Sequence, residues 1–317
     1  MYVICMYRRG QSSGFEPHAT MVAPLVVVSL LLLGCVALAA MANETHAGVA
    51  LALGLQRQIA TTWRSDAGWA PTTDVVHWQA NETALVLIDL WDNHWCDAMA
   101  QRGIDLSLRV NRTASRLRAR GVHILHSPSA PALAFYDGTP ARARAQHAPH
   151  VSPPGPTNTT DPAPPALQTL GPLAGCDSGQ TNTGKNEPTR QSALIWIDEE
   201  RDAVVNSDDG AEVHSYLQAV GVKHLLYVGA ASNMCILHRQ DGTLAMSRWG
   251  YEVVVVRDEV DAMFTSNDAP YIDHTTANAL QVGYIERFVC PTVDSRDLDY
   301  PKLPLKPETE GLPTHYK

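Results

Sequence analysis

The chain has 317 residues and a formal net charge of −9. Apolar residues make up 45% of it and charged residues 18%, so it can bury a substantial core beneath a sparsely charged surface. No run rich in Lys and Arg occurs, which argues against nucleic acid as a partner, and the mild acidic excess is that of a soluble protein surface.

The first 45 residues are predicted to be a targeting segment rather than part of the fold. Arg8 and Arg9 precede an uncharged stretch over 19–43, whose centre is almost pure Val and Leu. The stretch ends in small residues, and 37–39 and 40–42 both fit an A-x-A cleavage site. It is also long enough to span a bilayer. Residues 1–45 are therefore either a cleaved signal peptide or a membrane anchor, and we expect a secreted or membrane-anchored protein that contacts a membrane only through this segment.

Sequons and cysteines fit an extracytoplasmic protein. Four asparagines, each with Thr two residues on, would be glycan acceptors in a secreted eukaryotic glycoprotein: Asn43, Asn81, Asn111 and Asn158. Four cysteines lie beyond the leader: Cys96, Cys176, Cys235 and Cys290. An oxidising compartment permits a disulfide, although spacing cannot give its connectivity. Cys96 and Cys290 are the candidate pair, which would tie the loop after the first strand to the last helix; two free buried thiols are the alternative.

The first half of the fold is predicted as strand, helix, strand. Residues 46–82 are mixed in character and are expected to wrap the core. The unbroken apolar run 84–88, followed by Asp89, is typical of a strand buried on both faces of a parallel sheet. A second strand is predicted over 122–126. Between them, a helix that ends at Gly121 is indicated by apolar residues at helical spacing: Leu106, Val110, Ala114 and Leu117.

A long insertion follows at about 128–190, and it holds more than half of the chain's 21 prolines. We interpret it as an insertion rather than a domain boundary, because the alternation of strands and helices resumes after it. Its part from 148 to 172 is predicted to be disordered. Phe135 and Tyr136, near its start, are candidates to fold over a site.

The second half of the chain alternates again. Strands are predicted over 192–197, 203–205, 224–228 and 251–256, and helices over 211–220, 234–249 and 274–288. This pattern predicts an α/β fold, a single doubly wound and mostly parallel sheet with helices on both faces, in a Rossmann-like three-layer sandwich. The domain spans 83–298, and 299–317 form a C-terminal tail. Sites in such folds lie at the carboxyl ends of the strands.

A cysteine follows the strand over 224–228. The small-residue turn 229–233 delivers Cys235 to the first turn of the next predicted helix. The partial positive charge and free N–H groups of a helix N-terminus favour a thiolate and can stabilise an oxyanion. Cys235 is therefore a candidate nucleophile, with a buried structural cysteine as the alternative.

Asp89 ends the first strand, at the same predicted rim of the sheet as Cys235. A carboxylate there could take the thiol proton and return it to a leaving group. For an isolated aspartate, a helix cap or a loop position is the alternative.

Together these segments resemble the isochorismatase-like cysteine hydrolases, a superfamily that includes nicotinamidases, N-carbamoyl amidohydrolases and isochorismatases. The resemblance spans about 83–298 and rests on ALVLIDLWD around Asp89, YVGAASNMCILHR around Cys235 and GYEVVVVRDEVDAM after it. It implies that Asp89 and Cys235 are catalytic. It also implies a turn with oxyanion amides and a cis peptide bond, here expected at Ala231–Ser232, so that the residues of this turn are Ala231, Ser232 and Met234.

One departure from the family concerns its third catalytic residue, a lysine just after the strand that follows the middle loop. The matching stretch 203–210 contains no lysine, and Lys185 and Lys223 lie elsewhere. Arg190, His94 and His126 are candidates to substitute for it. The wider set of pocket candidates that this comparison suggests is Trp91, Asp92, His94, His126, Tyr136, Arg190 and Asn206.

A metal site is only weakly indicated. Some nicotinamidases bind a metal near the pocket with Asp and His, and Asp92, His94 and His126 are the corresponding candidates here. Histidines of this kind are more often hydrogen-bonded or pocket-lining, so we predict neither a metal nor another cofactor.

The sequence thus predicts a hydrolase of a small amide or ureido C–N bond, with a thioester on Cys235 and Asp89 as proton shuttle. Because the lysine is missing, a non-catalytic protein that binds a small ligand on the same scaffold is an alternative. An isochorismatase-type vinyl-ether hydrolase is another. A small molecule is the expected partner, and a homo-oligomer stays open.

Overall fold

The computed structural model describes residues 49–61, 68–156, 175–267 and 271–298. The predicted leader, the tail, most of the stretch predicted to be disordered and the sequons at Asn43 and Asn158 lie outside these ranges. No helix within them is long and apolar enough to cross a membrane.

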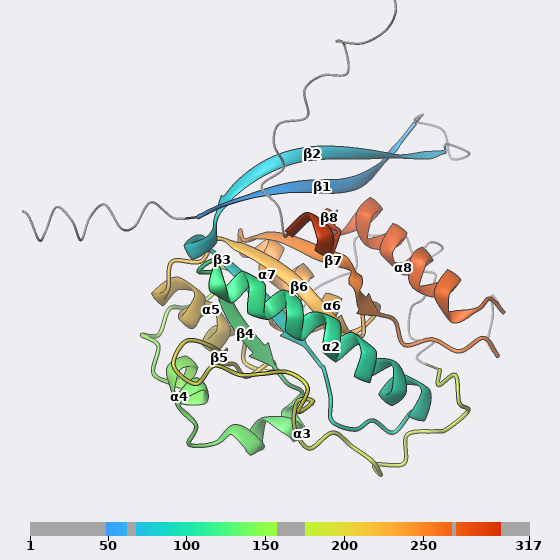
Figure 1. Ribbon diagram of the computed structural model, residues 1–317, viewed down its shortest axis with the longest axis horizontal. Coiled ribbons are helices and arrows are strands. Elements are labelled where there is room, and N and C mark those ends of the chain that lie inside the picture. Colours follow the sequence, from blue (N-terminus) through green and yellow to red (C-terminus); the bar gives the residue numbers. More distant parts are fainter. Residues whose placement is uncertain (1–48, 62–67, 157–174, 268–270, 299–317) are drawn as a thin grey trace, which may run out of the picture. The chain divides into compact units, whose positions relative to one another are not determined.

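A single eight-stranded sheet runs through the described residues in the order β2-β1-β8-β7-β6-β3-β4-β5 (Figure 1). Strands β3 to β8 pair in parallel, and only β1 pairs antiparallel, with β2 and β8. This confirms the predicted mostly parallel sheet. The strands are β1 (Ala50–Ala60), β2 (Trp69–Gln79), β3 (Thr83–Ile88), β4 (His123–Ser127), β5 (Ala203–Val204), β6 (His224–Ala230), β7 (Glu252–Asp261) and β8 (Thr292–Val293).

Helices cover both faces of the sheet, as predicted. Leu85 and Leu87 of β3 pack in one apolar cluster with α2, whereas Val86 and Ile88 pack in another with α5, α6, α7 and α8. The alternation follows from the strand period of two. The helices are α2 (Asp97–Ala119), α3 (Ala130–Leu133), α4 (Pro140–Gln146), α5 (Gly210–Ala219), α6 (Cys235–His238), α7 (Thr243–Arg248) and α8 (His274–Phe288), with 3₁₀ turns η1 (Ala80–Glu82), η2 (Ala134–Tyr136) and η4 (Ser295–Leu298).

The segment expected to wrap the core is a β-hairpin. Strands β1 and β2 extend the sheet beyond β8 (Figure 1). Leu51, Leu53 and Leu55 of β1 are buried in the same cluster as α2. Most of β2 is exposed, because it is the edge strand and Trp78 is its one fully buried side chain.

Two predicted elements are wrong. Residues 192–197 form turns instead of a strand, since Leu194 and Trp196 are exposed rather than buried as a sheet would require. The predicted helix 234–249 is divided into α6 and α7. The break begins after His238, where Arg239 has an extended backbone (φ −63°, ψ 163°). It ends at Gly242, the N-cap of α7, which packs so closely that an added Cβ would lie 2.8 Å from the Leu237 carbonyl.

The disulfide pairing also differs from the expectation. Cys96 is bonded to Cys176, with an S–S distance of 2.13 Å and Cα atoms 5.6 Å apart, and Cys290 is a free buried thiol. The Cys96–Cys290 pair was wrong because the two residues lie at opposite ends of the parallel strands. Cys96 comes after the carboxyl end of β3, while Cys290 precedes β8.

The two described sequons differ in accessibility. Asn81 is exposed in η1. Asn111 lies inside α2, where its Oδ1 accepts the Trp196 amide, and the hydroxyl of Thr113 donates to Glu259 in the core at 2.6 Å. Asn81 is thus the better placed glycan acceptor of the two.

The disulfide should contribute measurably to stability, because it closes a chain loop with a sequence separation of 80. We expect Cys96→Ser to lower the free energy of unfolding by about 2–4 kcal/mol, as for a long closed loop. Urea unfolding of the oxidised protein measures this. Cys290→Ser, which leaves the bond intact, is the matched control for losing a buried cysteine. Equal unfolding of wild type and Cys96→Ser would contradict the expectation.

Candidate active site

The carboxyl ends of β3 and β6 bring the two sequence-predicted catalytic residues to one place. The two strands are neighbours, with Ile88 opposite Gly229. They approach so closely that a Cβ on Gly229 would lie 1.9 Å from the Ile88 carbonyl oxygen, and Gly229 has φ 109°. Only glycine accommodates both the contact and the positive φ. Asp89 follows β3, and the turn to Cys235 follows β6.

Asp89 is held in an unusual backbone conformation and is almost completely buried. Its φ is +48°, and its side chain is 1% exposed. Positive φ is uncommon for a residue other than glycine and costs free energy that the surrounding structure must offset. Its amide donates to the Ser127 carbonyl of β4 at 3.3 Å, which fixes where the carboxylate leaves the strand.

Three side chains approach the Asp89 carboxylate. Arg239 Nη2 lies 2.5 Å from Oδ2, and the side chains of Cys235 and Trp91 lie close enough to lower the pKa of the same group. Burial raises the pKa of Asp89, while the charge of Arg239 and the hydrogen bonds from its neighbours oppose that rise. Asp89 thus sits between a thiol and a guanidinium.

Cys235 is the first residue of α6, and its side chain is partly exposed. Burial and the charge of Asp89 raise its pKa to about 12, although Arg239 and the Ala231 amide lower it. The expected helix-terminus effect on the thiolate is not found, since α6 has only four residues and a single turn carries little dipole. At neutral pH the resting site therefore holds a protonated thiol beside the Asp89–Arg239 pair.

Arg239 is a site residue that the sequence reasoning missed. It caps the C-terminus of α6, four residues after Cys235, and its side chain is 15% exposed. Burial disfavours its charge, but Asp89, Cys235 and Asp241 more than compensate and raise its pKa. Helical spacing could not have found it, because α6 ends at His238 and Arg239 has an extended backbone (φ −63°, ψ 163°).

The three candidates for the missing cation have partners elsewhere. His94 accepts the Cys96 amide at Nδ1 (3.1 Å). Arg190 lies over the Phe135 ring and 3.8 Å from Asp92. His126 is enclosed between Gln191 and Asp202, with its Nε2 3.1 Å from the Asp202 carboxylate. The cation beside Asp89 comes from the loop after Cys235 instead.

Several pocket candidates fasten the insertion to the sheet. Asp92 accepts hydrogen bonds from the amides of Thr189 and Arg190 and from the Thr189 hydroxyl (2.6 Å). Desolvation opposes these bonds, but together they lower the pKa of Asp92. The Tyr136 hydroxyl accepts the Gln191 amide at 2.9 Å, and Gln191 bridges to Trp91. This end of the insertion therefore lies against the loop that follows Asp89.

An aromatic group stands beside the site. Trp91, which contacts Asp89, packs on His94 with ring centroids 4.5 Å apart, and His94 packs on Trp95 at 5.2 Å. Burial lowers the pKa of His94, so it is neutral at neutral pH. Asn206 has a different role, because its Oδ1 accepts the Asp208 amide in the turn before α5.

Asp92, His94 and His126 do not come together as metal ligands. The described residues contain no group of three His, Cys, Asp or Glu side chains arranged to hold a metal ion.

The turn before Cys235 contains a cis peptide bond, at Ala230–Ala231 rather than at the expected Ala231–Ser232. The Ser232 amide donates to the Asp261 carbonyl (2.8 Å) and the Met234 amide to the Ala231 carbonyl (3.0 Å). The Ala231 amide is directed at the Cys235 sulfur. The Cys235 amide makes no hydrogen bond within the described ranges, which leaves it as a candidate oxyanion donor.

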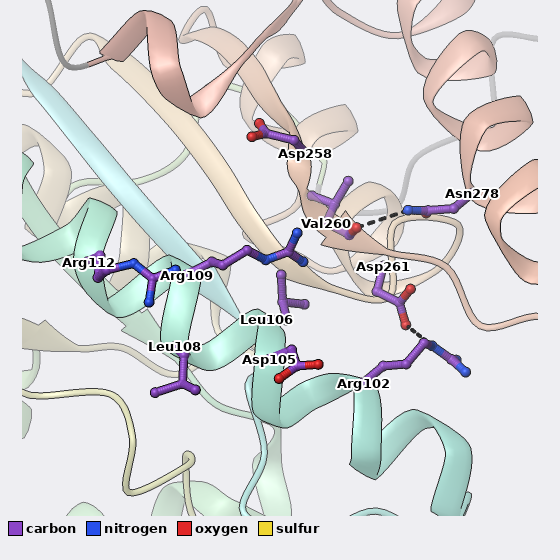
Figure 2. Close-up of a pocket in the computed structure, with 10 residues that line it drawn as sticks. All are labelled: Arg102, Asp105, Leu106, Leu108, Arg109, Arg112, Asp258, Val260, Asp261 and Asn278. Atoms are coloured by element: carbon purple, nitrogen blue, oxygen red, sulfur yellow. Dashed lines mark hydrogen bonds and ion pairs between the residues drawn. The ribbon is translucent and has the colours of Figure 1, made fainter.

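A separate pocket of about 550 Å³ lies between α2 and the end of β7 (Figure 2). Its charged lining is balanced between arginines of α2 and aspartates: Arg102, Arg109, Arg112, Asp105, Asp258 and Asp261. Arg102 Nε donates to the Asp261 carboxylate at 2.9 Å, and His274 contacts the same carboxylate. The Asp261 carbonyl also accepts the Ser232 amide, so this ionic cluster helps to hold the turn before Cys235 in place. Neither Cys235 nor Asp89 lines the pocket.

Comparisons with known proteins found similar chains among solved structures. No protein-family model matches the chain, and no curated protein matches it. Among solved structures, it is similar to a cysteine hydrolase from Pseudomonas syringae pv. phaseolicola 1448A, with 11% identity, a TM-score of 0.46 and coverage of 70% of this chain and 92% of that one. An isochorismatase family protein from Burkholderia thailandensis has 19% identity, a TM-score of 0.40 and coverage of 69% and 94%.

A third similar structure is N-carbamoylsarcosine amidase from Thermoplasma acidophilum, with 15% identity, a TM-score of 0.34 and coverage of 68% and 96%. At such identities and TM-scores these structures say nothing about the reaction of this chain.

The close approach of β3 and β6 can be tested at Gly229. We expect Gly229→Ala to prevent folding or lower the unfolding free energy by more than about 4 kcal/mol, because both the backbone clash and the positive φ must be relieved. Thermal unfolding measures the loss. Gly121→Ala is the matched control, since Gly121 has φ 93° but no atom within 4 Å of an added Cβ. It should cost only about 1 kcal/mol. Similar losses for both would contradict the close contact.

The Arg239–Asp89 pair should show strong energetic coupling. We expect Arg239→Met to cost about 3–5 kcal/mol of unfolding free energy, because it leaves a carboxylate buried without its cation. A double-mutant cycle with Asp89→Asn measures the coupling. The exposed Lys223–Glu82 pair, at 2.6 Å, is the control and should couple by less than about 1 kcal/mol. Equal coupling in the two cycles would refute a special role for the buried pair.

Proposed function

We propose that this chain is a cysteine hydrolase of the isochorismatase-like superfamily that cleaves a C–N bond in a small amide or ureido substrate. The observation that carries the proposal is the meeting of the Cys235 thiol, the Asp89 carboxylate and the Arg239 guanidinium at the carboxyl edge of the sheet. A thiol, a base in contact with it and a cation that orients the base are the parts that nucleophilic acyl transfer needs.

In the first half of the reaction, Asp89 takes the thiol proton as the sulfur forms a bond to the substrate carbonyl carbon. The raised pKa of Cys235 means that the proton is transferred during the attack instead of being lost beforehand. The Cys235 amide is a candidate donor to the developing oxyanion. Collapse of the intermediate breaks the C–N bond, and Asp89 returns the proton to the leaving nitrogen.

In the second half, water attacks the thioester on Cys235. Asp89, ionised again, accepts a proton from that water, and the thiol leaves with a proton while the acid is released. Arg239 remains cationic throughout and balances the negative charge that moves between Asp89 and the sulfur. Its place 2.5 Å from Asp89 supports the idea that it does what the lysine does in the family.

The alternatives from the sequence lose support for different reasons. The non-catalytic binding protein was suggested by the missing lysine, and Arg239 now supplies a cation beside Asp89. No described feature favours a vinyl ether over an amide.

We further propose that the protein acts on a small molecule outside the cytoplasm, either secreted or anchored through its first 45 residues. The Cys96–Cys176 disulfide supports this, because such bonds persist in oxidising compartments.

Turnover of a panel of small amides, ureido compounds and vinyl ethers tests the function. We expect hydrolysis of a C–N substrate to fall by at least about 10³-fold in Cys235→Ala and Asp89→Asn, because each removes a group that takes part in bond making. Rapid quenching and mass spectrometry should find the acyl group on the peptide that contains Cys235.

Cys290→Ala is the matched control, since it removes the other free cysteine and should retain activity. Turnover that survives Cys235→Ala, or no turnover of any compound, would count against the proposal.

A further inference from the structure

Asp241 is a buried carboxylate that the proposed reaction does not use. It lies in the loop between α6 and α7, two residues after Arg239, and is 1% exposed. The Tyr227 hydroxyl donates to its backbone carbonyl at 2.7 Å, and Ser127 Oγ donates to its Oδ2 at 2.5 Å. Because the Ser127 carbonyl accepts the Asp89 amide, one serine of β4 connects the two buried aspartates.

One polar atom of Asp241 and one of Arg239 lack hydrogen-bond partners among the described residues. They are Asp241 Oδ1 and Arg239 Nη1, and both are buried. The other guanidinium nitrogen, Nη2, is the one on Asp89. Arg239 forms its ion pair with Asp89 and is also within electrostatic reach of Asp241 and Cys235. One buried cation thus faces two buried carboxylates and a thiol, and two full negative charges there would exceed what it neutralises.

We infer that Asp241 is a positioning residue whose protonation sets how much of the Arg239 charge acts on Asp89 and Cys235. When Asp241 is ionised, it takes a share of the guanidinium's field. When Asp241 is neutral, the whole charge acts on the Asp89–Cys235 pair, and the thiol proton leaves more readily. The inference rests on the proposed function in one respect, namely that Cys235 is the nucleophile.

The surroundings of Asp241 determine where it titrates. Burial raises its pKa to about 6, the Arg239 charge and the Ser127 hydrogen bond oppose this, and Asp89 on β3 adds to the rise. Tyr227 on β6 is the other titratable group in contact, and burial raises its pKa well above 10, so it stays neutral. Asp241 is thus neutral below about pH 6 and ionised above it, and the thiol pKa should be lower on the acid side.

The test is the alkylation rate of Cys235 by iodoacetamide in the folded full chain, from about pH 5 to about pH 9, which needs no substrate. In Asp241→Asn the side chain is a carboxamide, which is neutral at every pH and whose oxygen can still accept a hydrogen bond from the Ser127 hydroxyl. We expect this variant to react at the wild-type rate near pH 5. Near pH 8 it should react about tenfold faster, which corresponds to one unit of thiol pKa.

Ser127→Ala is the second variant, because it removes the hydrogen bond that stabilises the ionised carboxylate and so raises the pKa of Asp241. It should exceed the wild-type rate only in a window above about pH 6 and return to it at higher pH. Cys235→Ala gives the background labelling, since the remaining free thiol, Cys290, is buried.

A ratio of Asp241→Asn to wild-type rates that does not change with pH would overturn the inference, because a merely structural residue alters the rate equally at every pH. If Asp241→Asn fails to unfold cooperatively, absence of the window in Ser127→Ala overturns it instead. Wild-type labelling no faster than background would defeat the nucleophile itself. That result is distinct from the case in which wild type is labelled above background but the ratio of the Asp241→Asn rate to the wild-type rate does not change with pH.

Discussion

Burial of the Asp89 carboxylate at the end of a central strand costs free energy, and the Arg239 guanidinium 2.5 Å away offsets that cost. The pair determines how the site can work. Without the cation, a carboxylate at 1% exposure would take up a proton and could not accept one from the thiol. With it, Asp89 can remain a base beside a protonated Cys235. In the proposed reaction, Cys235 is therefore activated by a neighbouring base at the moment of attack instead of resting as a thiolate.

The same requirement explains the shape of the chain after Cys235. A continuous helix from 234 to 249 would carry Arg239 and Asp241 along its surface. Instead α6 ends at His238, and in the loop that follows Asp241 reaches Ser127 at the end of β4. The local loss of helix is compensated by buried ionic and hydrogen-bonded contacts, and the short α6 leaves little dipole to act on the sulfur.

The second half of the insertion lies against the loop that follows Asp89. The Cys96–Cys176 disulfide, the hydrogen bonds of Asp92 and the Gln191–Trp91 bridge fasten its second half to the loop after β3. These contacts connect residues about 80 to 100 positions apart in the sequence. Composition alone, rich in proline and polar residues, predicted a break in the fold but could not reveal which residues return to the core.

The sequence by itself determined the α/β architecture and the two ends of the site. The unbroken apolar run 84–88 predicted a strand buried on both faces, and the small-residue turn 229–233 follows a second strand, so Asp89 and Cys235 could be assigned to one rim. Only the tertiary structure identified the cation, the disulfide partner and the position of the cis peptide bond. Local patterns record hydrophobic period and turn chemistry. The identity of a charge that neutralises Asp89 depends on how a broken helix folds back through space, and no periodicity encodes that.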